Sequence, residues 1–400
     1  MPSRRSSNVF QLTKSQQRAV WSFAAVVILA LIAVIFPKQA ATPGIPPTDL
    51  VPATNTPLAL GVTPQSDLPT WLKIYFTNPN PPDDINNGID RFILPILDGA
   101  NKTIDVVSFD VNLPSVVNAL VKAHLRGVKV RVIYDGKQGD AEVDNDFVGQ
   151  FNGVETLDKA NVSMVDGGRS NGLMHNKFII VDGKILIMGS WNISYNDTFR
   201  NNNNVLVITA PQLIANYQAK FNEGFEQKRF GAKAEVGAQT SSMVIEGVQV
   251  ENYFSPVDEV MQKLVGYIQG AKKSVHFYAF TYTHADLATA MIESAKAGVD
   301  VQGIIENRGA SQGALVPLYC AKLPVKTDGN KYTMHHKVIV IDSSIVVTGS
   351  FNFTKSADTA NDDNVLVIHS SAVATLYEQE YQRLLAIANL PNPAEITCQK

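Results

Sequence analysis

The chain has 400 residues, of which 45% are hydrophobic and 18% are charged, and its formal net charge is −3. This length and composition fit a globular protein of two or three domains with ample core. Residues 1–39 carry five basic and no acidic residues, which leaves 29 basic and 37 acidic residues, a balance of −8, in the rest of the chain. So acidic a region disfavours a broad nucleic-acid binder.

Cys320 and Cys398 are the cysteines of the sequence. Two isolated cysteines do not form a zinc-binding pattern. If the folded region is exported, they could pair and hold the C-terminal tail against the second half of the chain. Two unpaired thiols are the alternative.

The N-terminus predicts a membrane anchor. Residues 19–36 are almost entirely apolar, and 18 helical residues span about 27 Å, close to the hydrocarbon core of a bilayer. Basic residues within the segment 1–18 indicate that this segment is cytoplasmic and that the chain is a single-pass membrane protein with an extracytoplasmic catalytic region. The alternative is secretion after cleavage of residues 1–41, but Lys38 and Gln39 at the −3 positions suit cleavage poorly.

A Pro- and Thr-rich linker is predicted over residues 37–70. It would hold a catalytic unit away from the membrane. The remainder is predicted to form two lobes, residues 71–235 and 236–400, joined through a segment at 230–247.

The two lobes repeat one order of predicted elements at one constant offset along the chain. The predicted elements are strand 103–110, helix 114–126 and strand 129–134 in the first copy, and strand 274–282, helix 285–297 and strand 299–305 in the second. Alternating strands and helices indicate an α/β fold with buried sheets. The duplication predicts two similar lobes related by a pseudo-twofold axis, with a shared site on that axis.

A more specific motif recurs at a second, slightly shorter offset. It reads His-x-Lys-(x4)-Asp-(x6)-Gly-Ser-x-Asn and would rarely arise twice by chance. Its members are His175, Lys177, Asp182, Gly189, Ser190 and Asn192 in the first copy, and His335, Lys337, Asp342, Gly349, Ser350 and Asn352 in the second.

The motif places an imidazole beside a fixed positive charge. Residues i and i+2 of a strand face the same side, so His175 and Lys177 are expected to share a face, as are His335 and Lys337. This combination suits a phosphodiester, because the lysines neutralise its oxygens while one imidazole attacks phosphorus and the other protonates the leaving oxygen.

The remaining motif residues have supporting roles in this interpretation. Donors to the same phosphate are expected at Ser190, Asn192, Ser350 and Asn352. Asp182 and Asp342 are an odd number of residues from the histidines, so we expect them to stabilise turns at the strand ends rather than act on the substrate.

These residues resemble the HKD signature of the phospholipase D superfamily, over about residues 71–390. The resemblance implies one site between the lobes, a covalent phosphohistidine on one histidine, and the other histidine as general acid and then base, without a metal or other cofactor. The family commonly has an acidic residue after the Gly-Ser-x-Asn segment, which corresponds to Asp363, whereas the first copy has Asn203. We expect Asp363 to support His335. Which histidine attacks stays open.

Three functions follow as hypotheses. The first is an anchored, monomeric phospholipase D-type enzyme that acts on a phospholipid, with hydrolysis and transfer to an alcohol both open. The second is an endonuclease of the same superfamily acting on DNA or RNA, which the acidic balance disfavours. The third is a non-catalytic phosphate-binding scaffold, which the intact His and Lys residues of both copies disfavour.

Overall fold

The computed structural model describes residues 68–139, 142–145 and 149–398. The predicted cytoplasmic segment, the apolar segment 19–36 and nearly all of the linker lie outside these residues. Within the described part of the chain, no helix is both long and apolar enough to cross a membrane.

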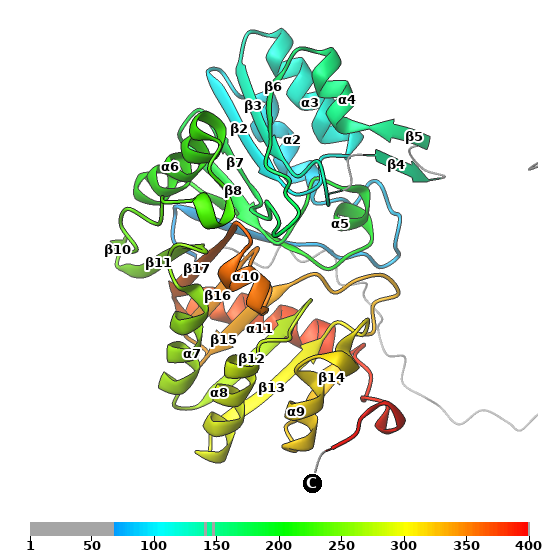
Figure 1. Cartoon of the computed structure of the whole chain (residues 1–400), viewed down its shortest axis with the longest axis vertical. Coiled ribbons are helices and arrows are strands. Elements are labelled where there is room, and N and C mark those ends of the chain that lie inside the picture. Colours follow the sequence, from blue (N-terminus) through cyan, green and yellow to red (C-terminus); the bar gives the residue numbers. More distant parts are fainter. Residues whose placement is uncertain (1–67, 140–141, 146–148, 399–400) are drawn as a thin grey trace, which may run out of the picture. The chain divides into compact units, whose positions relative to one another are not determined.

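The first lobe is built on a mixed sheet (Figure 1), in which β2–β3 and β3–β6 are parallel and the other pairs antiparallel. The strand order is β1 (Leu72–Phe76), β9 (Asn204–Ile208), β8 (Ile185–Gly189), β7 (Phe178–Val181), β2 (Thr103–Ser108), β3 (Lys129–Tyr134) and β6 (Ser163–Asp166). The outer face packs on apolar residues of α2 (Asp90–Asp98), α3 (Pro114–Leu125), α4 (Gly153–Lys159) and α5 (Tyr195–Phe199).

The second lobe repeats this plan. The strand order is β10 (Ser242–Ile245), β11 (Val248–Ser255), β17 (Asp363–His369), β16 (Ile345–Gly349), β15 (Lys337–Ile341), β12 (Ser274–Ala279), β13 (Asp300–Ile305) and β14 (Val325–Thr327). One face packs on α7 (Val260–Gly270), α8 (Ala285–Lys296) and α9 (Leu315–Cys320). Short elements complete the lobes, namely hairpin β4–β5 (Glu142–Asn145, Gly149–Asn152), α10 (Lys355–Thr359), and the 3-10 turns Gly231–Lys233, Ala310–Gln312 and Pro393–Glu395.

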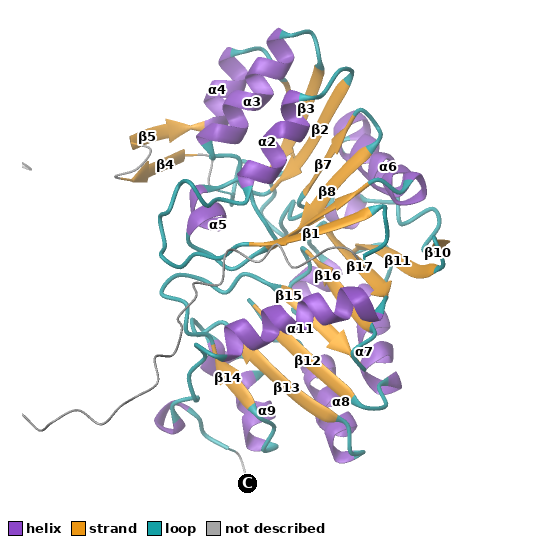
Figure 2. Cartoon of the chain, turned by 180° about the vertical axis from the view of Figure 1, so that it is seen from behind, coloured by secondary structure: helices purple, strands orange, loops and turns teal. Residues whose placement is uncertain are grey.

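The two lobes share a hydrophobic core. It contains apolar residues of both sheets together with α6 (Pro211–Gln227) and α11 (Ser371–Leu385), whose aromatic pairs Tyr217 and Phe221, and Tyr377 and Tyr381, are buried. Figure 2 shows α11 crossing the strands of the second sheet. The predicted α/β fold with two similar lobes is therefore confirmed.

The predicted strands and helices agree with the observed ones to within a few residues, but several observed strands were not predicted, among them β1 and β11. β1 forms an antiparallel edge beside β9, whereas β11 lies between the edge strand β10 and β17 and is antiparallel to both. Neither contains a motif residue, and their patterns were not recognised as strands.

The motif glycines are required by close backbone packing. Gly189 and Gly349 have φ values of +149° and +147°, and a Cβ atom on either would lie 2.2 Å from the carbonyl oxygen of Asn204 or Asn364 on the neighbouring strand. Only glycine accepts both conditions without a shift of the backbone. The glycines therefore hold β8 and β16 tightly against β9 and β17.

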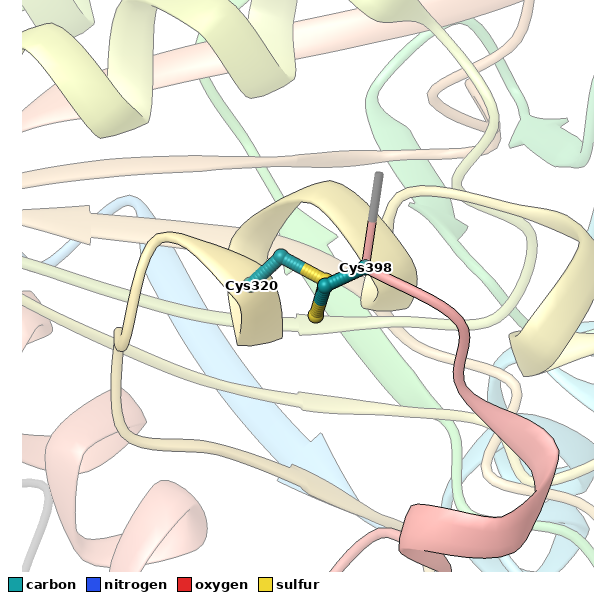
Figure 3. The surroundings of a disulfide bond; sticks show 2 residues. All are labelled: Cys320 and Cys398. Carbon is teal, nitrogen blue, oxygen red and sulfur yellow. A yellow bond between two sulfur atoms is a disulfide. The ribbon is translucent and has the colours of Figure 1, made fainter. Parts of the chain in front are cut away.

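The pairing of Cys320 and Cys398, left open by the sequence, is present in the structure (Figure 3). Their Cα atoms are 5.5 Å apart, and 78 residues separate them in sequence. Cys320 ends α9, so the bond attaches the C-terminal tail to the second lobe.

Reduction of this disulfide is expected to lower the free energy of unfolding by about 2–4 kcal/mol, because a cross-link over so long a loop restricts the unfolded chain. Urea unfolding with and without reductant measures the difference. The Cys320→Ser, Cys398→Ser double variant serves as control and should not respond to reductant. Equal unfolding midpoints for the oxidised and reduced wild type would contradict this expectation.

Candidate active site

His175 and His335 each lie in a loop just before a strand, β7 or β15, and we call these the histidine loops. Each loop is held by an acidic residue of its own lobe. Asp135 follows β3 and accepts the backbone N–H of Met174 at 3.0 Å, and Glu306 follows β13 and accepts that of Met334 at 2.8 Å. These contacts hold the backbone directly before His175 and His335.

Each histidine loop also pairs with the opposite lobe. The backbone N–H of His175 donates to Asp362 O, and that of His335 donates to Asn202 O, both at 2.9 Å. The sequence motif alone did not indicate this crossing, because it relates each histidine only to residues of its own copy.

The crossing corrects the expected partner of His335. Asp363 Oδ1 lies 2.7 Å from Nδ1 of His175, whereas Nδ1 of His335 lies 2.9 Å from Oδ1 of Asn203. The expectation that Asp363 supports His335 was wrong, because the segment after each Gly-Ser-x-Asn sequence reaches the histidine of the other lobe. The predicted inequivalence of the histidines stands, with the carboxylate on His175 and the amide on His335.

Both histidines line one cavity of about 510 Å³. With Nδ1 of each ring held by a side chain of the opposite lobe, Nε2 is the nitrogen left for a substrate. The edges of the rings pack against Phe109 and Phe280, whose centroids lie 5.4 Å and 4.8 Å from those of His175 and His335. Burial, followed by the charge of a neighbouring lysine, lowers the pKa of both histidines, although Asp363 opposes this shift at His175.

Lys177 and Lys337 are buried and fold back onto their own motifs. Their Nζ atoms donate to the backbone carbonyls of His175 and His335 at 2.9 Å and 2.6 Å. Burial lowers the pKa of Lys177 to about 8 against the attraction of nearby carboxylates, and burial together with the charge of Lys177 lowers the pKa of Lys337 well below its usual value. Both ammonium groups are thus held close to the histidines at a cost in solvation.

The predicted phosphate donors divide into two kinds. Asn192 and Asn352 line the cavity. Ser190 and Ser350 do not, since their hydroxyls are fully buried and donate to Asn203 Oδ1 at 2.8 Å and Asp363 Oδ1 at 2.6 Å. The structure therefore places the serines behind the partners of the histidines rather than beside a substrate.

Asp182 and Asp342 lie at the far ends of their strands. Asp182 accepts backbone N–H groups from residues 101–103, and Asp342 accepts those from residues 272–274. Burial alone would raise the pKa of both carboxyls, but these donors give a net lowering. Each aspartate thus joins the turn after its histidine strand to the start of the neighbouring strand.

Asp197 is a site residue that the sequence did not reveal. It lines the cavity on α5, and its Oδ2 lies 3.5 Å from Nδ1 of His335. The corresponding residue of the second copy is Ala357, a mismatch within the repeat that could have drawn attention to it.

Among the described residues, no cluster of His, Cys, Asp or Glu side chains is arranged to hold a metal ion.

The buried lysines generate a prediction about stability and pH. Unfolded lysine keeps its proton up to about pH 10.5, whereas folded Lys177 loses it near pH 8, so the unfolded state binds more protons in between and stability rises with pH. The wild type should therefore gain about 1–2 kcal/mol more than Lys177→Met between pH 7.5 and 9.5. Urea unfolding at several pH values measures this. Lys184→Met, at an exposed turn, should follow the wild type, and parallel curves for Lys177→Met and wild type would refute the prediction.

A comparison with known protein families finds one match in each lobe. A family profile described as "Cardiolipin synthase, PLD-like domain" matches residues 93–224 and 264–385, more than half of the chain. The chain is 31% identical over 129 residues to a mitochondrial cardiolipin hydrolase of Xenopus laevis, an alignment that covers 32% of this chain and 61% of that protein. It is 34% identical over 134 residues to a phospholipase D of Rickettsia prowazekii, covering 33% of this chain and 65% of that protein.

The chain thus spans about three fifths of the length of the first of these relatives. The chain is similar in structure to phosphatidylserine synthase from Haemophilus influenzae, whose crystal structure aligns with a TM-score of 0.61 at 12% identity. The alignment covers 80% of this chain and 87% of the synthase chain. At that identity the likeness shows a shared fold.

Proposed function

The chain belongs to the phospholipase D superfamily, and we propose that it is a phosphodiesterase that hydrolyses the head-group phosphodiester of a phospholipid. The observation that carries this proposal is the meeting of His175 and His335, one from each lobe, on a single cavity. Each imidazole has its Nδ1 engaged and a buried lysine in its own motif. Two such groups are what a two-step displacement at phosphorus requires.

In the first step of the proposed reaction, Nε2 of one histidine attacks phosphorus. An N–P bond forms and the P–O bond to the head group breaks, while the other histidine donates its proton to the departing oxygen. In the second step, that same histidine takes a proton from water, whose oxygen displaces the imidazole and gives phosphatidate. Lys177 and Lys337 would stabilise the charge that develops on the phosphoryl oxygens.

The lining of the cavity favours a lipid head group over a nucleic-acid strand. Among the described residues that line it, Arg308 is the one lysine or arginine, and it is accompanied by the carboxylates of Asp110 and Asp197 and the rings of Phe109 and Phe280. A nucleic-acid groove usually presents several cations to successive phosphates. The balance of −8 outside residues 1–39 points the same way.

The proposed location is the outer face of a membrane. The apolar segment 19–36, with basic residues before it, supports a single-pass anchor that keeps the site close to lipid. The disulfide between Cys320 and Cys398 supports an oxidising, extracytoplasmic compartment for the catalytic lobes.

The test is release of head group from phospholipid vesicles by the full-length protein. Replacing either His175 or His335 by alanine should lower the rate about 10²–10⁴-fold, because each replacement removes a nucleophile or an acid–base group. His124→Ala, on the outer helix α3, is the matched control and should retain the wild-type rate. Trapping of a phosphorylated histidine on the wild type would identify the covalent intermediate.

The outcomes separate the three hypotheses. Wild-type inactivity on every common phospholipid, together with degradation of single-stranded DNA that weakens steeply with salt, would replace the lipid substrate by nucleic acid. Failure to turn over a generic aryl phosphodiester, with no phosphohistidine, would instead support a non-catalytic phosphate-binding protein.

A further inference from the structure

The two half-sites carry their acidic side chains in different places. At the offset that relates His175 to His335, Asn203 of the first lobe corresponds to Asp363 of the second, and Asp197 corresponds to Ala357. The first lobe therefore has an amide where the second has a carboxylate, and a carboxylate where the second has a methyl group. The number of carboxylates is the same in both lobes at these two positions.

Asp197 is built into the wall of the cavity beside His335. Its Oδ2 accepts the backbone N–H and the side-chain amide of Asn192 at 2.8 Å and 2.7 Å, and its Oδ1 accepts the amide of Asn201 at 2.6 Å. The residue is only 3% exposed. These donors are neutral amides, so they orient the carboxylate and leave its charge to act on the cations of the site.

Several features of the site disfavour the protonated form of His335, and a nearby negative charge would offset them. Burial and the charges of Lys337, Lys177, His175 and His336 all lower its pKa. Asn203, its direct partner, is uncharged and can orient the ring but cannot offset these cations.

Two other carboxylates near this half-site are directed to other partners. Glu306 accepts the backbone N–H of Met334, and Asp363 is bonded to His175. Asp197 Oδ2, at 3.5 Å from Nδ1 of His335, is the carboxylate placed to stabilise a proton on that ring.

We propose that Asp197 is a positioning residue that supplies the charge for His335, taking the part that Asp363 has for His175. The inference rests on the proposed function, since it concerns one of the two histidines of that reaction. Asp363 of the second lobe both orients the imidazole of His175 and supplies a negative charge beside it. In the first lobe two residues share these roles, because Asn203 orients the imidazole of His335 and Asp197 stabilises its protonated form.

The experiment compares variants on a generic aryl phosphodiester. Asp197→Asn keeps the shape of the side chain and should lower kcat about 10–100-fold, by analogy with the losses found when the carboxylate behind a metal-ligating histidine is removed, with KM nearly unchanged. The pKa of His335 in the pH–rate profile should move to lower pH. The double variant Asp197→Ala, Asn203→Asp copies the arrangement of the second lobe and should recover most of the lost kcat. Asp98→Asn, at an exposed end of α2, is the control and should match the wild type.

Two results would overturn the inference. One is an unchanged kcat and pH profile for Asp197→Asn. The other is a loss of kcat that comes without a pH shift and is not recovered in the double variant, since that pattern describes a merely structural residue. If Asp197→Asn does not fold, the double variant alone decides, because its activity and pH profile should approach those of the wild type.

A direct titration separates this inference from the proposed function. The Cε1–H signal of His335, identified by its loss in His335→Gln, can be followed by NMR from pH 4 to 9 in wild type and Asp197→Asn. A lower pKa in the variant supports the inference even if no substrate is turned over. Equal pKa values would refute it even in an active enzyme.

Discussion

The hydrogen bonds between each histidine loop and the backbone of the other lobe are the constraint on which the site depends. Through them, Asp362 and Asn202 accept the N–H groups of His175 and His335. Once these residues are paired, their neighbours Asp363 and Asn203 have to lie against the same two imidazoles. Neither lobe alone would give its histidine a side-chain partner for Nδ1.

A buried polar layer keeps the lobes in this register. The amide of Asn204 donates to Thr348 and Tyr377 of the second lobe, and Tyr217 of the first donates to Asn364 of the second. A buried donor or acceptor that loses its partner costs about 1–3 kcal/mol, so a displaced interface would lose several such contacts at once. The arrangement that brings the histidines together is thereby the arrangement that satisfies the interior.

The fold was largely readable from the sequence, because the duplication revealed the unit and its elements. The histidines and lysines were readable for the same reason. The partners were not, because a fixed offset assigns Asp363 to the motif of its own copy, which begins at His335, rather than to the distant His175. The serines were misjudged because strand alternation does not show whether a hydroxyl after Gly189 or Gly349 faces a cavity or a neighbouring side chain. The predicted anchor at 19–36 lies outside the described residues and stays a prediction.

The difference between Asp197 and Ala357 also bears on how such a protein can change over time. In a symmetric pair of identical chains, every substitution enters both half-sites together, so moving a carboxylate in one would disturb both histidines at once. Two copies within one polypeptide are free of that restriction. A substitution near one histidine, and a second substitution that compensates for it, can occur in one half while the other half stays unchanged. Because both halves lie in one polypeptide, the surroundings of the two histidines can differ, as the different positions of Asp197 and Asp363 in the repeat illustrate.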